Sequence, residues 1–372
     1  MKNPFRLAFI AIAVLTTFAQ APAQTTTRNS LPNASPAVNQ TVVSALASLP
    51  DADTLIYVNP RRILNDAAPK VVAATELTKM RATFGDLKKG IGVDPSSIDY
   101  LVLAVRFNKP SGDLSFVAPD IVAIASGDFS ADSLMTIARL QLQGDARDEK
   151  YGTRTLAITK LDPIAKASEK YPLLKSFAEI AFAPLNTNTL VIGNVSYVKA
   201  AMDAADGTGR IPGNAISSLV RDPNALVSFA GSPLTAFAKS FGLLGTQTSP
   251  RDPRCETALG NFYAAITMEG NSFNVRGAMN ADNPDTARIL HGLLSGLLQQ
   301  AVTAVPDKDA QNLLNGLKMT TSDSEVVISA AIPESVVADM IREQSKPKVT
   351  IATSSAPQKK PVVRKRTRPR RK

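Results

Sequence analysis

The stretch FYAAITMEGNSFNVRGAMN, residues 262–280, decides the fold class of this chain. Two segments rich in strand-forming residues, 262–269 and 272–280, flank Gly270-Asn271, a pair that is typical of tight turns. In the second segment apolar and polar side chains alternate with a period of two, Phe273, Val275 and Met279 against Asn274, Arg276 and Asn280. The alternation predicts an antiparallel hairpin with one buried face.

The rest of the chain alternates between predicted strands and predicted helices. Strands are predicted at 54–58, 98–107, 120–125, 153–159, 180–183, 189–192, 225–230, 317–321 and 325–330. A polar cap residue or a proline precedes an apolar stripe at several places, which predicts helices there. These helices begin after Asn59-Pro60, at Ser130, at Ser196, at Asn283-Pro284 and at Pro333.

The order strand, helix, hairpin, helix, hairpin, helix occurs twice, which indicates an internal duplication. The alternative is a chance similarity between two runs of strands and helices. We therefore predict an α+β fold of two similar halves, each a mainly antiparallel sheet with helices packed on one face. The first α+β unit is expected to span 42–210 and the second 211–345.

Residues 49–58 read LPDADTLIYV and are followed by Arg62-Ile63-Leu64 and by Gly92-Val93-Asp94-Pro95. In these motifs the chain resembles secreted bacterial proteins known only as a domain of unknown function. Segment 188–201 fits the same pattern, so the resemblance covers most of both units. It implies export and an α+β fold, and it implies no activity, because none is assigned to that family.

The first residues have the features of a secretory signal peptide. Lys2 and Arg6 precede an apolar stretch from Leu7 to Phe18, and Ala21-Pro22-Ala23 supplies a cleavage site with small residues. The apolar stretch is shorter than the roughly 20 residues that a spanning helix needs. We predict a signal peptide at 1–23, cleavage after Ala23 and a disordered linker at 24–41, which places the protein in the periplasm or outside the cell.

Positive charge is concentrated at the C-terminal end of the chain. Residues 346–372 contain eleven Lys or Arg and no Asp or Glu. Without these eleven and the two in the leader, 29 basic residues remain against 32 acidic ones. The body is therefore slightly acidic, although the net charge of the chain is +10. The tail is expected to be disordered, because it is rich in proline and charge and poor in large apolar residues.

A basic tail indicates a negatively charged partner. The tail residues expected to contact anions are Lys359, Lys360, Arg364, Lys365, Arg366, Arg368, Arg370, Arg371 and Lys372. For an exported protein the partner is an anionic envelope polymer or lipid. Nucleic acid would bind such a tail too, and a tail without a partner is the remaining alternative.

Few residues of the chain fit a catalytic or metal site. Cys255 is the only cysteine and His291 the only histidine, so a zinc site of soft ligands lacks enough ligands. His291 lies in a strongly apolar helical segment, and the sequence contains no Gly-x-Ser-x-Gly motif. Both observations favour a packing role for His291 over that of a catalytic base. The sequence predicts no cofactor and no metal site.

A Ser/Lys pair, and an unrecognised pair among the 32 carboxylates, leave a hydrolase as an alternative. Ser196 and Lys199 match the Ser-x-x-Lys motif of penicillin-binding enzymes, but no Lys-Thr-Gly follows. We expect Ser196 to cap a helix and Lys199 to lie in solvent. Asp145, Asp148 and Glu149 are interpreted as a charged, solvated loop rather than a calcium site. The favoured function is a non-enzymatic exported protein that binds or scaffolds in the cell envelope.

Overall fold

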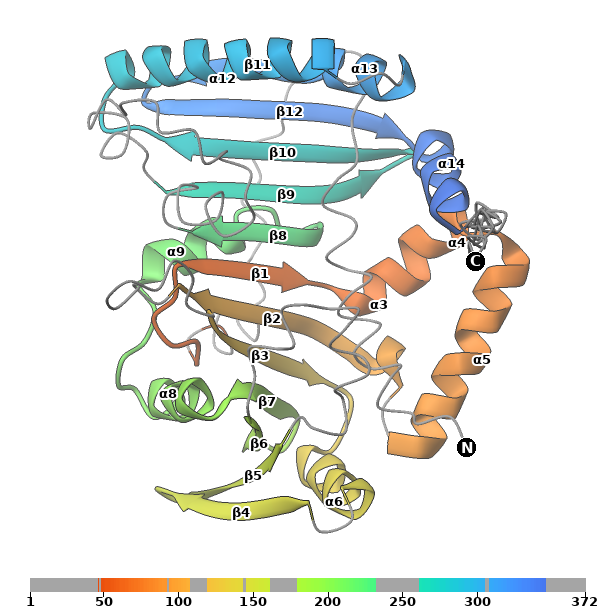
Figure 1. Ribbon diagram of the computed structural model, residues 1–372, viewed down its shortest axis with the longest axis vertical. Helices are drawn as coiled ribbons and strands as arrows, with labels where there is room; N and C mark the ends of the chain where they lie inside the picture. Colours follow the sequence, from red (N-terminus) through yellow and green to blue (C-terminus); the bar gives the residue numbers. More distant parts are fainter. Residues whose placement is uncertain are drawn as a thin grey trace, which may run out of the picture.

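A single antiparallel sheet of twelve strands runs through the part of the chain that this computed structural model describes (Figure 1). The described residues are 46, 48–91, 94–107, 119–142, 145–160, 179–231, 261–304 and 308–345. The strand order is β11-β12-β10-β9-β8-β1-β2-β3-β7-β6-β5-β4. The α+β fold class is thus confirmed.

The strands of the first predicted unit are β1 (Thr54–Val58), β2 (Ile98–Arg106), β3 (Asp120–Gly127), β4 (Ala146–Tyr151), β5 (Arg154–Lys160), β6 (Glu179–Asn186) and β7 (Thr189–Asn194). Those of the second are β8 (Ala225–Gly231), β9 (Phe262–Glu269), β10 (Ser272–Asn280), β11 (Lys318–Ser322) and β12 (Glu325–Pro333). The β9–β10 hairpin turns at Gly270, whose φ of 58° lies in the left-handed region that favours glycine. The hairpin that decided the fold class is confirmed.

The helices before the middle of the chain are α3 (Pro60–Arg62), a π-helical turn (Ile63–Ala67), α4 (Ala68–Val71), α5 (Ala74–Ile91), a 3₁₀ turn (Pro95–Ser97) and α6 (Ala131–Gln141). Those after it are α8 (Val195–Ala205), α9 (Gly213–Leu219), α12 (Pro284–Ala304), α13 (Lys308–Asn315) and α14 (Glu334–Ser345). Two predicted caps are confirmed. Asn59 Oδ1 accepts a bond of 2.9 Å from the Arg62 amide, and Ser130 Oγ accepts one of 3.2 Å from the Ser133 amide.

Strands of the two predicted units belong to one sheet, not to one sheet each. β1 and β8 are antiparallel neighbours at its centre, with Thr54 opposite Gly231 and Val58 opposite Val227. Pairing at this seam removes two sheet edges that separate halves would have exposed. The division into units at 42–210 and 211–345 stays a prediction.

Helices pack on both faces of the sheet, which differs from the predicted single face. On β6, Ala181 and Ala183 pack with α8, whereas Ile180 and Phe182 pack with Met135 of α6. Successive side chains of a strand point to opposite faces, so this strand is apolar on both sides. A strand with two apolar faces needs cover on each of them.

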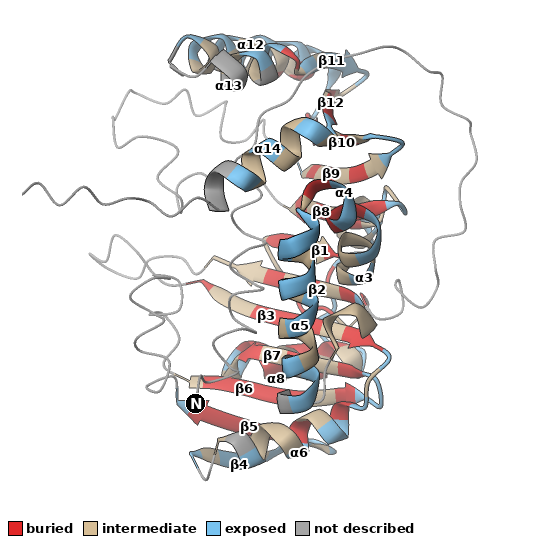
Figure 2. Ribbon diagram, turned by 90° about the vertical axis from the view of Figure 1, so that its right-hand side faces the viewer, coloured by how far each residue is buried: buried red, intermediate tan, exposed pale blue. Residues whose placement is uncertain are grey.

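The largest cluster of buried side chains lies between α8, α9 and the strands of the first half. It includes Leu55, Val102, Ile124, Leu156, Val191, Tyr197 and Met202. Figure 2 shows buried residues concentrated in the strands, while the residues of α5 whose burial is described are exposed or half-buried. No helix in the described part of the chain is long and apolar enough to cross a membrane.

Candidate functional site

A cavity of about 150 Å³ opens where the two halves of the sheet meet. Its walls come from the segment before β1, from α9 and the residues before it, and from the adjoining ends of β8 and β9. Apolar side chains on these elements are Ala52, Leu55, Ile211, Pro212, Ala215, Ala230 and Phe262. Asp51, Asn214, Ser218 and Asn261 add a carboxylate, two amides and a hydroxyl. The walls thus combine apolar surface with a few polar groups, in a volume smaller than the roughly 300–1,000 Å³ of most small-molecule sites.

Backbone hydrogen bonds hold the two walls of the seam cavity together. The Ile211 amide donates to the Leu49 carbonyl at 3.0 Å, and Pro50 and Arg210 form an isolated antiparallel bridge. The Tyr197 hydroxyl donates to the carbonyl of Asp51, a residue that lines the cavity, at 2.7 Å. Burial raises the pKa of the Tyr197 phenol, which therefore stays a donor at neutral pH.

Close packing between β1, β8 and α9 sets the shape of the cavity. A Cβ on Gly231 would lie 2.4 Å from the Asp53 carbonyl oxygen, so this wall requires glycine. The buried Ser228 hydroxyl donates to the Leu219 carbonyl at 2.7 Å, which attaches the end of α9 to β8. These contacts fix the positions of β1, β8 and α9 around the cavity.

An arginine extends the polar surface near Asp51. Arg106 Nη2 lies 2.7 Å from Asp120 Oδ2, and its guanidinium carbon lies 4.8 Å from the centre of the Tyr197 ring. The hydrogen bond to Asp120 raises the pKa of Arg106. Asp53 Oδ2 accepts from the Phe107 amide at 2.7 Å. These contacts connect the ends of β1, β2 and β3 within the chain.

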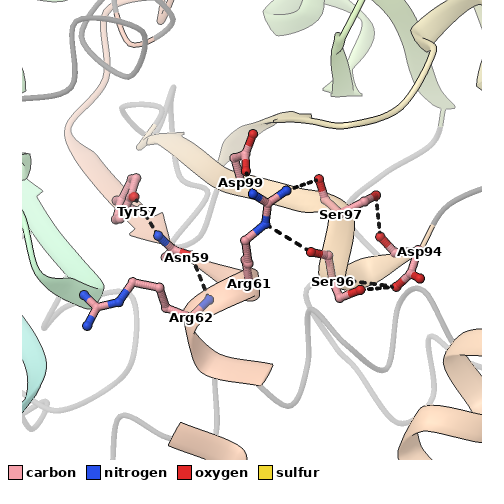
Figure 3. A network of polar contacts seen from close by, with 8 residues as sticks. All are labelled: Tyr57, Asn59, Arg61, Arg62, Asp94, Ser96, Ser97 and Asp99. Atoms are coloured by element: carbon pink, nitrogen blue, oxygen red, sulfur yellow. Dashed lines mark hydrogen bonds and ion pairs between the residues drawn. The ribbon is translucent and has the colours of Figure 1, made fainter. Parts of the chain in front are cut away.

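A second polar cluster lies at the other end of β1 and has a structural role (Figure 3). Arg61 Nη1 lies 2.9 Å from Asp99 Oδ1, and Arg61 Nε donates to the Ser96 carbonyl at 3.3 Å. Asp94 Oδ1 accepts from the Ser96 amide at 3.0 Å and from its hydroxyl at 2.6 Å. The cluster joins α3 to the 3₁₀ turn before β2. Motif residue Asp94 thus acts as a cap.

Comparison with known proteins gives only distant likenesses. No protein-family model matches the chain, and no curated protein matches it. Among solved structures, crystal form III of TP0453 is similar with a TM-score of 0.44 at 10% identity, over 80% of this chain and 97% of that chain. Crystal form I of TP0453 gives a TM-score of 0.42 at 9% identity, over 82% and 98% of the two chains.

The predicted anion-contacting residues lie outside the described part of the chain. This holds for the whole tail at 346–372, for the signal peptide at 1–23, for the linker at 24–41 and for Cys255. Their predicted roles stay predictions.

The Ser-x-x-Lys pair is not joined by a hydrogen bond in the described part of the chain. Lys199 Nζ forms an ion pair with Glu149 and lies 5.4 Å from the centre of the Tyr151 ring. The sequence suggested a freely solvated Lys199. The ion pair shows that it is not one. Ser196 is exposed and is the second residue of α8, whose N-cap is Asn194. The prediction that Ser196 is the cap was wrong by two residues.

The charged segment before Tyr151 is a strand, not the predicted loop. β4 pairs with β5 over its whole length, from Ala146 opposite Thr159 to Tyr151 opposite Arg154. Asp148 forms an ion pair with Arg139 at 3.0 Å.

His291 is half-buried on α12 next to the buried Leu290. No group of three His, Cys, Asp or Glu in the described ranges is placed to hold a metal ion.

Sequence reasoning missed the seam cavity. Asp51 belongs to the LPDADTLIYV motif, yet Asn214 and Asn261 lie far from it in sequence. Only the pairing of β1 with β8 brings these residues together. The described residues that line the cavity include no His, Cys or Lys, so the arrangement suits binding by hydrogen bonds.

Proposed function

We propose that this chain is a non-enzymatic protein of the cell envelope that contacts an anionic polymer or lipid through residues 346–372. One observation carries the proposal. Eleven Lys or Arg residues in this segment have no acidic neighbour in sequence, whereas the remainder of the chain after the leader is slightly acidic. The leader at 1–23 supports export, and the resemblance to secreted bacterial proteins is part of the same proposal.

Several positive charges of the described body are neutralised by neighbouring carboxylates. Examples among the described residues are Arg106 with Asp120 at 2.7 Å, Arg154 with Asp206 at 2.7 Å and Arg221 with Glu325 at 3.0 Å. Such pairs have little charge left for a partner. The terminal segment is therefore the part of the chain suited to attract an anionic surface.

The attraction is expected to be modest. Each basic residue near an anionic lipid surface contributes about 1 kcal/mol. If a third to a half of the eleven engage, the sum is about 4 kcal/mol, which corresponds to a dissociation constant of about 1 mM. Weak attraction of this kind localises a protein when a second contact adds to it. The seam cavity, with Asp51, Asn214 and Asn261 at its surface, is suited to a small ligand of the body.

An internal duplication is also part of the proposal, and the strand order supports it. Outward from the β1–β8 seam the order is β1-β2-β3-β7-β6 on one side and β8-β9-β10-β12-β11 on the other. In both halves a helix follows the third strand, a hairpin returns beside that strand, and a helix follows the hairpin. The first half has the additional hairpin β4–β5 at its edge.

Co-sedimentation with vesicles tests the tail. The exported chain is mixed with vesicles of neutral lipid alone and with vesicles that also contain anionic lipid, at low and at physiological salt. We expect binding to the anionic vesicles only, and less of it at higher salt. Neutralising four tail residues should weaken binding about tenfold. The substitutions are Arg364→Gln, Lys365→Gln, Arg366→Gln and Arg368→Gln.

A matched control removes four exposed charges from the body. The substitutions are Lys79→Gln, Arg81→Gln, Lys89→Gln and Lys150→Gln, all at exposed positions. This variant should bind as the unmodified chain does. Equal retention of the full chain and of a chain that ends at Ser345 would discard the tail as the anionic contact. Loss of binding in the control variant would move the contact to the body.

A further inference from the structure

The two edge strands of the sheet differ in charge. β4, at the bottom of Figure 1, carries four charged residues in succession, from Arg147 to Lys150. β11, at the top, has the sequence KMTTS and carries one charge, on Lys318. An edge strand exposes backbone amides and carbonyls that can pair with another strand, and charged side chains are a common protection against this. β4 has that protection and β11 does not.

The register of the β11–β12 hairpin determines which backbone groups face the open edge. Ser322 pairs with Glu325 across the two-residue turn Asp323-Ser324. In such hairpins the residues that flank the turn exchange hydrogen bonds, and every second pair along the ladder does so. Thr320 and Lys318 therefore bond to β12. The amides and carbonyls of Met319 and Thr321 are directed outward, along a strand on which Thr320 and Thr321 are exposed.

We propose that β11 pairs antiparallel with β11 of a second copy of this chain, around a twofold axis at Thr320. This register places Met319 of one copy opposite Thr321 of the other, twice by symmetry. The outward groups of each strand then meet the outward groups of its copy, which gives four backbone hydrogen bonds. The sheets of the two copies then join into one continuous sheet across the β11–β11 contact.

Charge supports a second copy as the occupant of this edge. In the proposed register Lys318, which is exposed, lies opposite the uncharged Ser322 of the second copy. Like charges directly opposite each other on neighbouring strands destabilise their pairing, and this register has none. By contrast, full-length pairing of β4 with its own copy would set Arg147 against Lys150 and Asp148 against Glu149.

The helix beside this edge presents no charge that would oppose association. α12 lies against β11, with Ser295 Oγ 3.5 Å from Met319 Sδ. Its segment 289–304 contains no Asp, Glu, Lys or Arg, and Ile289 and Leu293 are 71% and 50% exposed. A twofold axis normal to the sheet puts both copies of α12 on the same face. The outer edges of the pair are then the two charged β4 strands, so assembly ends at two copies.

Sedimentation equilibrium of the exported chain tests the proposal. We expect a monomer–dimer equilibrium at micromolar concentrations. Thr321→Pro removes an outward amide without removing a bond to β12, and should weaken dimerisation at least about tenfold. Thr321→Val keeps the amide and the shape of the side chain, and should change the dissociation constant less than about threefold. Thermal unfolding of both variants checks that the hairpin is intact.

A charge exchange distinguishes this register from other contacts. Ser322→Lys places an ammonium opposite Lys318 of the second copy, twice by symmetry. This change should weaken dimerisation about tenfold, and the double variant with Lys318→Glu should restore it, because opposite charges then face each other. Positions 318 and 322 are about 13 Å apart within one strand, so the restoration cannot arise inside one copy.

Two results would overturn the proposal. One is a chain that stays monomeric at all concentrations up to about 100 µM, because its self-association would then be weaker than a specific pairing requires. The other is a dimer that both Thr321→Pro and Ser322→Lys leave intact, since the contact would then lie elsewhere. Hydrogen exchange gives an independent reading, because the amides of Met319 and Thr321 should become protected as the concentration rises.

Discussion

Arg106 lies over the ring of Tyr197, with the guanidinium carbon 4.8 Å from the ring centre. The contact joins the end of β2 to α8. Tyr197 also donates its hydroxyl to the carbonyl of Asp51, which lines the seam cavity, at 2.7 Å. One buried side chain thus connects the sheet, a covering helix and the segment that leads into β1. In the other half Arg221 lies over Tyr263 at 4.7 Å in a similar way.

The first prediction concerns the Tyr197 hydroxyl. Tyr197→Phe should lower the free energy of unfolding by about 1–3 kcal/mol, because the ring stays buried while the Asp51 carbonyl loses its donor. Urea denaturation measures the change. Tyr151→Phe is the matched control. Its hydroxyl donates to Asp203 at 2.9 Å at a more exposed position, so the loss should be smaller. Equal losses in both variants would contradict the role assigned to Tyr197.

Local patterns were sufficient to predict most elements of the fold. Val58, Asn59 and Pro60 mark the end of a strand, a cap and the start of a helix, and each lies where these residue types indicate. Alternation from Phe273 to Asn280 predicted β10 in the same way. Strand propensity, caps and turns act over a few residues, so one sequence contains them in full.

Pairing between distant strands could not be predicted in this way. β1 and β8 are separated by more than 160 residues, and nothing in Thr54–Val58 indicates which strand lies beside it. The seam cavity depends on that pairing. The strand β4 was missed for another reason, because its charged residues suggest a loop. At a sheet edge such residues face solvent, and backbone bonds to β5 hold the strand.

The second prediction concerns the close approach of β1 and β8. Gly231→Ala should destabilise the protein by about 1–3 kcal/mol, because the new methyl group would lie 2.4 Å from a backbone oxygen at Asp53. Gly292→Ala is the control with the opposite expected sign. Gly292 is exposed within α12 and has no atom within 4 Å of the added Cβ, so alanine should stabilise by about 0.5–1 kcal/mol. Both values follow from denaturation midpoints at unchanged slope. A neutral Gly231→Ala would mean that the two strands can separate at no cost.

The third prediction concerns pH and the cap at Asp94. The hydrogen bonds from Ser96 lower the pKa of this carboxyl below its usual value. A lowered pKa in the folded state means that the charged form stabilises the fold above the unfolded pKa of about 3.9, and that this contribution is lost as the pH falls through the folded value. At pH 7, Asp94→Ala should therefore cost about 1 kcal/mol, typical of a lost cap. The difference between the two proteins should shrink as the pH falls below about 4. Urea denaturation at several pH values measures it, with the exposed Asp86→Ala as a control that should show little difference at any pH. If the difference in free energy of unfolding grew as the pH fell, the charged form of the Asp94 carboxylate would not be the form that stabilises the turn.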